Sequence, residues 1–163
     1  MLVAFAVFAR LVPHPANFAP LAAVALFSGA ILPRRWALVV PVIAMVTSDI
    51  IIGLHPLVLY TWGSFALIAL IAGKYLTALR FSRVVASSVG ASVLFFLVTN
   101  FGVWMQGLMY PKTGAGLIQC YINAIPFFRG TLLGDLFYSA MLFGLYAFFV
   151  ASSQAKAPLQ AIK

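Results

Sequence analysis

Long apolar runs, broken by proline, glycine and basic residues, dominate this chain of 163 residues. Hydrophobic residues make up 64% of the sequence and charged residues only 7%, against roughly 25% charged residues in a soluble domain. A soluble fold would need polar side chains to cover its surface, and this chain lacks them. The composition therefore excludes a soluble enzyme and a disordered chain, and it indicates an integral membrane protein of one domain.

The apolar runs predict an all-α, polytopic membrane protein with about six transmembrane helices, because one bilayer crossing takes about 20 helical residues. The expected helices cover residues 1–12, 18–32, 36–54, 57–79, 84–105 and 130–150. The first would be about 18 Å long, against a hydrocarbon core of about 30 Å. It is therefore a partial or tilted span, or the true start lies upstream. We expect a single transmembrane domain over 1–153 and a short cytoplasmic tail over 154–163.

A long connection, 106–129, separates the last two expected helices. It begins with the turn-forming stretch GLMYPKTGAG and continues with the apolar stretch LIQCYINAIPFF. The second stretch is too short to cross a bilayer. We expect it to form a short interfacial or re-entrant segment in an outer loop.

Basic residues set the expected orientation, with both termini in the cytoplasm. This orientation places on the inner side Arg34, Arg35, Lys74, Arg80, Arg83, Lys156 and Lys163. Only Arg10, Lys112 and Arg129 fall on the outer side, in agreement with the positive-inside rule. The net charge of +8 therefore reflects topology and attraction to anionic lipid, and it does not indicate a nucleic-acid partner.

In this topology the uncommon polar side chains gather at the outer end of the bundle. Asp49, Asn100 and Asp135 would all lie roughly 8 Å below the outer surface. Polar groups at that depth are costly when they face lipid, so we expect them to face one another or an aqueous cavity. Apolar walls with a few polar groups are typical of a ligand pocket. The expected ligand-binding residues are His14, Asn17, Asp49, Trp62, Asn100, Trp104, Lys112, Tyr121, Asn123, Arg129 and Asp135.

The chemistry of these side chains suggests their roles. Aromatic members would wall or stack on a small, planar ligand, and the carboxyl and amide groups would hydrogen-bond it from below. The two basic members would contact an anionic group. His14 and Asn17 would close the first loop over the ligand.

Other interpretations of the same residues remain open. In a self-satisfied polar network, Asp49 would pair with Arg10, Asp135 would pair with Arg129, and amides would bridge helices. A membrane enzyme would use the two carboxyl groups as acid and base. A structural or assembly protein would bind another envelope protein at the outer end. No nucleotide-binding or metal-ligand motif occurs, so we expect no cofactor, and Cys120 is interpreted as a small apolar filler.

Four stretches of the chain carry a resemblance to a known family: RLVPHPANFAPLAAVALFSGA, TSDIIIGLH, VTNFGVW and YPKTGAGLIQCYINAIPFFRGTLLGDLFY. They resemble a family of small bacterial integral membrane proteins of unknown function. That family is similar to the substrate-binding S components of energy-coupling factor (ECF) transporters. The resemblance implies a capture protein in the bacterial cytoplasmic (inner) membrane for a scarce water-soluble nutrient. It also implies a transmembrane coupling subunit and paired cytoplasmic ATPases as partners.

Overall fold

The computed structural model describes the backbone of residues 1–160 and the side chains of residues 1–153. Its elements are the helices α1 (Leu2–Leu11), α2 (Leu21–Ile31), α3 (Arg34–Ile52), α4 (Val58–Tyr75), α5 (Phe81–Gln106) and α6 (Gly114–Gln160). The prediction of an all-α fold is confirmed. The expected tail is only partly described, since α6 continues into it and residues 161–163 lie outside the described part.

Four of these helices are long and apolar enough to cross a membrane. They are α3, α4, α5 and the Gly114–Ser153 part of α6. The other two, α1 and α2, have 10 and 11 residues, which gives helices about 15–17 Å long. The fold is therefore compatible with a multi-pass membrane protein, while the expected number of six spans stays a prediction.

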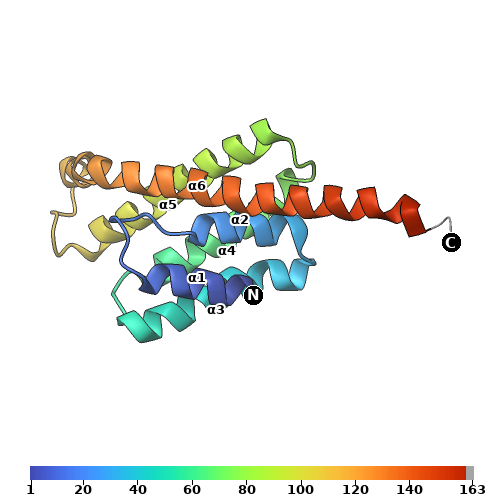
Figure 1. Ribbon diagram of the computed structural model, residues 1–163. Coiled ribbons are helices and arrows are strands. Elements are labelled where there is room, and N and C mark those ends of the chain that lie inside the picture. The colour runs from blue at the N-terminus through green and yellow to red at the C-terminus, as the bar shows by residue number, and fades with distance from the viewer. Residues whose placement is uncertain (161–163) are drawn as a thin grey trace.

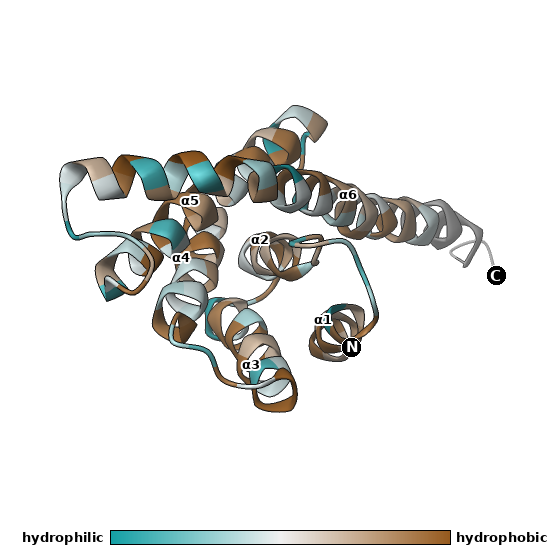
Figure 2. Cartoon of the chain, turned by 90° about the vertical axis from the view of Figure 1, so that its left-hand side faces the viewer, coloured by the Kyte–Doolittle hydropathy of each residue, from teal (hydrophilic) through white to brown (hydrophobic). Residues whose placement is uncertain are grey.

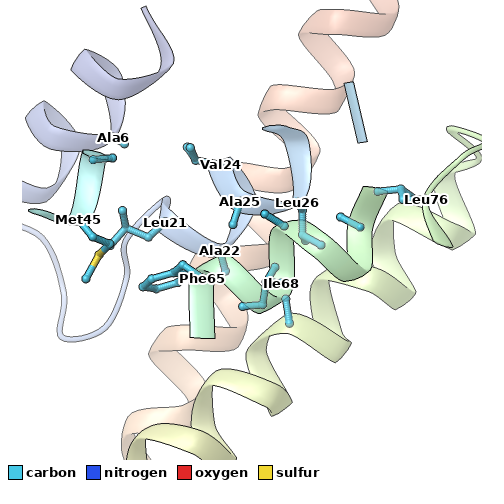
Figure 3. Packing of buried hydrophobic residues seen from close by; sticks show 14 of the residues in the cluster. Ala6, Leu21, Ala22, Val24, Ala25, Leu26, Met45, Phe65, Ile68 and Leu76 are labelled. Atoms are coloured by element: carbon cyan, nitrogen blue, oxygen red, sulfur yellow. The ribbon is translucent and has the colours of Figure 1, made fainter. Parts of the chain in front are cut away.

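The centre of the bundle is α2. Figure 2 views this helix nearly end-on, with the other helices around it, and Figure 3 shows its side chains against those of α4. Its residues from Leu21 to Leu26 are all buried. The small residues Ala22, Ala23, Ala25 and Gly29 of this helix are therefore packed inside the bundle.

Small residues let α2 and α4 approach closely. A Cβ atom added to Gly29 would collide with the carbonyl oxygen of Ala69 and would lie 2.9 Å from the Cβ of Ala72. A Cβ added to Gly73 would in turn lie 3.0 Å from the carbonyl oxygen of Gly29. Close backbone approach through small residues is the usual way in which helices associate in membranes.

The connection expected over 106–129 is mostly helical, which corrects the prediction. The loop between α5 and α6 spans only 107–113, and α6 begins at Gly114 and continues through Pro126. Figures 1 and 2 show the first part of α6 crossing the end of the bundle and the rest running along it. A proline inside a helix removes one backbone hydrogen bond and bends the helix without ending it. The turn signals at 107–116 and this proline led to the wrong boundary.

Three connections meet at one end of the bundle: 12–20, 53–57 and 107–113 (Figure 1, left). The opposite end holds the connections 32–33 and 76–80. The basic residues at this second end are Arg34, Arg35, Lys74, Arg80 and Arg83. The second end of the fold is therefore rich in basic residues.

The outer surface of the bundle carries many large apolar side chains. Large hydrophobic side chains are exposed along the middle of several helices, among them Leu67, Leu70, Val93, Leu97 and Phe137. So many exposed large apolar side chains are unusual in soluble monomers. It fits a helix bundle whose sides face hydrocarbon.

Candidate functional site

A cavity of about 290 Å³ lies at the end of the bundle where the connections 12–20, 53–57 and 107–113 meet. All six helices and the first loop contribute to its walls. The lining residues are Arg10, His14, Asn17, Ala19, Leu21, Ala22, Met45, Ile52, Thr61, Phe65, Phe95, Thr131 and Asp135. The walls are mostly apolar with a few polar groups, which is the composition expected of a small-molecule site.

The first loop is held over this cavity by α6. The backbone of the loop passes so close to α6 that a Cβ on Gly134 would lie 3.1 Å from the Cα of Phe18, and one on Gly130 would collide with a loop carbonyl. Asn17 adopts a left-handed conformation with φ of 60°, which asparagine tolerates better than most residues. Its Nδ2 donates to the carbonyl oxygen of Phe127 at 3.4 Å. The two predicted loop residues, His14 and Asn17, are therefore placed at the cavity wall.

On one side of the cavity, Arg10 forms an ion pair with Asp49. The Nη1 atom of Arg10 lies 2.6 Å from Oδ1 of Asp49 and donates to Oγ of Ser48 at 2.6 Å. The Nε1 atom of Trp62 donates to Oδ2 of Asp49 at 2.7 Å, and Nε2 of His55 lies 3.9 Å from the same oxygen. Asp49 is fully buried and Arg10 is 17% exposed. The alternative pairing of Asp49 with Arg10 is confirmed, and the arginine, not the aspartate, reaches the cavity.

On the α6 side, Asp135 lines the cavity with only 3% of its surface exposed. Its Oδ2 accepts a hydrogen bond of 2.6 Å from Oγ of Ser92 on α5. Within residues 1–153, no Lys, Arg or His side chain lies within ion-pair distance of this carboxyl group. The alternative pairing with Arg129 is wrong. Six residues along a continuous helix turn the two side chains about 120° apart, and Arg129 is exposed.

Below Asp135, a polar strip continues between α5 and α6. Oγ of Ser139 donates to Oγ of Ser88 at 3.3 Å. Ser88, Ser92 and Ser139 are all buried. Hydroxyl groups at such positions hold membrane helices together, so this strip fixes α6 and its carboxyl group against α5.

The other predicted site residues lie away from the cavity. Asn100, expected to face the two carboxyl groups, donates from Nδ2 to the carbonyl oxygen of Phe96 in its own helix at 2.8 Å. The hydroxyl of Tyr121 donates to the carbonyl oxygen of Leu97 at 2.8 Å. These bonds join the first part of α6 to α5 or satisfy α5 itself. Neither residue is part of the cavity wall.

The predicted site residues near the loop 107–113 also form local hydrogen bonds away from the cavity. Nε1 of Trp104 donates to the carbonyl oxygen of Pro111 at 3.1 Å, and Nδ2 of Asn123 donates to the hydroxyl of Tyr110 at 3.2 Å. Lys112 is exposed on the loop. The predicted site thus divides into two groups: His14, Asn17 and Asp135 at the cavity with Asp49 and Trp62 behind its wall, and the rest around the start of α6.

The cavity also contains residues that the sequence did not single out as binding residues. Arg10 and the hydroxyl groups of Thr61 and Thr131 supply polar atoms. The rings of Phe65 and Phe95 stack with centroids 5.0 Å apart and an interplanar angle of 24°. A usable signal was the helical spacing of four, which places Thr131 on the face of Asp135. Among the described side chains, no group of three His, Cys, Asp or Glu is arranged to hold a metal ion.

The fold and the cavity together define a class: a bundle of apolar helices, compatible with several membrane crossings, with a small cavity at one end. The chain belongs to the family of unknown function DUF6580, whose model matches residues 1–158. No curated protein and no solved structure matches this chain.

Proposed function

We propose that this protein is a membrane-embedded substrate-binding protein for the uptake of a small water-soluble nutrient, such as a vitamin or a nucleobase-like compound. In this proposal it acts in the manner of the S components of ECF transporters. It lies in the bacterial cytoplasmic membrane with about six crossings and with both termini on the cytoplasmic side. Its ligand enters from outside, at the end of the bundle that carries the cavity.

The observation that carries the proposal is the cavity under the first loop. Its volume of about 290 Å³ approaches the range of small-molecule sites. It combines apolar and aromatic walls with a buried carboxyl group from α6.

Charge supports the proposed orientation. The end opposite the cavity carries Arg34, Arg35, Lys74, Arg80 and Arg83. Basic residues next to membrane helices favour the cytoplasmic side. The cavity then opens toward the side from which a nutrient arrives.

Energy for uptake would come from other proteins, because the sequence has no nucleotide-binding motif. A transmembrane coupling subunit and cytoplasmic ATPases are the partners that this role requires. The rival enzyme interpretation needs both carboxyl groups at the substrate. Asp49 does not line the cavity and is engaged by Arg10 and Trp62, so we propose no acid–base role for the two aspartates.

The test begins with the protein purified in mild detergent and analysed by mass spectrometry for bound small molecules. A thermal-shift screen against vitamins and nucleobases follows. We expect at least one stabilising compound. Asn17→Ala at the cavity should weaken its binding, whereas Asn123→Ala outside the cavity should not. Co-purification of an envelope protein, with neither a bound molecule nor a thermal shift, would instead favour the assembly role.

A further inference from the structure

The cavity is electrically asymmetric. On one side the cation of Arg10 is matched by Asp49 at 2.6 Å. On the other side Asp135 has a hydrogen bond from Ser92 and no cationic partner among the described side chains. The acidic residues of the whole chain number two. The unmatched one is the one whose side chain lines the cavity.

A buried carboxylate without a counter-charge is costly, and more so within a membrane. One hydroxyl donor satisfies only part of its hydrogen-bonding capacity, since an ionised carboxylate can accept about four hydrogen bonds. Ser92 bonds to Oδ2, and Oδ1 has no protein donor within residues 1–153. The site therefore lacks a positively charged donor at the point where the ligand would lie.

We propose that the ligand carries a protonated amine or a comparable organic cation that pairs with Asp135 inside the cavity. This inference rests on the proposed function and names the chemical class of its substrate. The rest of the wall suits such a ligand. Thr131 lies one turn before Asp135 and offers a hydroxyl, while the rings of Phe65 and Phe95 line the same space. Aromatic faces attract cations as well as flat apolar groups.

An anionic ligand fits this wall less well. The basic residues expected to contact an anion, Lys112 and Arg129, are exposed and do not line the cavity. Arg10 and His14 do line it, but Nη1 of Arg10 contacts Asp49 and Ser48, and Nδ1 of His14 lies 2.9 Å from the carbonyl oxygen of Pro15. A carboxylate or phosphate placed beside the carboxyl group of Asp135 would find no cationic partner there among the described side chains.

The test uses three matched probes that differ in one group: tryptamine, tryptophol and indole-3-acetate. Binding to the purified protein in lipid nanodiscs at neutral pH is measured by calorimetry. We expect the amine to bind at least about tenfold more tightly than the alcohol, as charge-assisted hydrogen bonds allow, and the acid to bind most weakly. Asp135→Asn keeps an acceptor for Ser92 but removes the charge, so the preference for the amine should disappear. Asp135→Glu should restore part of it, and Asn123→Ala should leave it intact.

Equal or tighter binding of the alcohol or the acid overturns the inference, as does an amine preference that survives in Asp135→Asn. Failure of the amine to bind overturns it as well. These results are separable from failure of the proposed function. A neutral or anionic compound that co-purifies and stabilises the protein would leave the binding role standing and remove only the cationic ligand. A protein that binds nothing in either screen would remove both.

Discussion

The ion pair between Arg10 and Asp49 gives the sharpest stability prediction. Arg10→Met keeps much of the apolar stem of the side chain and removes the guanidinium. The Oδ1 atom of Asp49 then loses the cation that lies 2.6 Å away. The carboxylate keeps only the contacts of its other oxygen, Oδ2, with Nε1 of Trp62 at 2.7 Å and Nε2 of His55 at 3.9 Å. Leaving one charge of a buried pair without its partner costs about 3–5 kcal/mol.

Replacing the other partner, Asp49, should lower the free energy of unfolding by less. Asp49→Asn keeps an oxygen for the indole N–H of Trp62 and removes the buried charge. Arg10 is 17% exposed at the cavity wall, so water can solvate part of its guanidinium. We expect the free energy of unfolding to fall by about 1–3 kcal/mol, the usual cost of a buried polar group that lacks a hydrogen-bond partner. The double variant removes both charges and should be destabilised by clearly less than the sum of the two single variants.

The assay is a double-mutant cycle measured by reversible unfolding in mixed micelles of dodecyl maltoside and sodium dodecyl sulfate. A coupling free energy of about 2–3 kcal/mol is expected, at the upper end for residues in contact. Arg83→Met serves as the matched control, because this arginine is exposed and forms no ion pair among the described side chains, so its loss should change stability little. Additive losses in the cycle, or an Arg10→Met protein as stable as the unchanged chain, would refute the reasoning.

Three further predictions concern helix contacts near the core and the cavity. Gly29→Val should lower the free energy of unfolding in detergent by about 1–3 kcal/mol, or prevent folding, because its side chain would collide with the backbone of α4. The control is Gly90→Val, since nothing lies within 4 Å of a Cβ at that position. Equal effects of the two substitutions would contradict the close crossing of α2 and α4. Gly134→Val should push the first loop away from α6 and weaken probe binding, and binding unchanged in calorimetry would be inconsistent with a loop that covers the site. Ser92→Ala should cost about 1–3 kcal/mol in the same unfolding assay, because it removes the donor of the buried Asp135, whereas Ser92→Thr should retain most of the stability.

The fold class was readable from the sequence because hydrophobicity acts over whole segments. Helices α3 and α4 were expected almost where they lie, since His55-Pro56 and the basic residues around Arg80 end or begin helices by local chemistry. The start of α6 was missed for the opposite reason. Pro126 is a local signal against a helix, but packing against α5 outweighs the one hydrogen bond that a proline removes.

The candidate site was only partly predictable. Depth alone located Asp135 and the loop residues correctly at one end, because a helix has a fixed rise per residue. Depth does not give the direction of a side chain, and Asn100 at similar depth bonds back to its own helix. Likewise, Trp62 was expected to wall the ligand, but its indole N–H is directed to Asp49. The hydrogen-bond and ion-pair partners of a polar group depend on contacts between segments that are distant in the sequence. A single sequence does not reveal these contacts.

The continuity of α6 has a mechanical consequence. The same helix carries the cavity carboxyl group and, eighteen residues later, Ser153 near the opposite end of the bundle, a distance of about 27 Å. A rigid rod pivoting by about 5° at the carboxyl group would move that far end by about 2 Å, a displacement of the size that switching helices use. If the cavity binds the proposed ligand, this one helix would transmit a change at the cavity directly to the opposite end of the bundle.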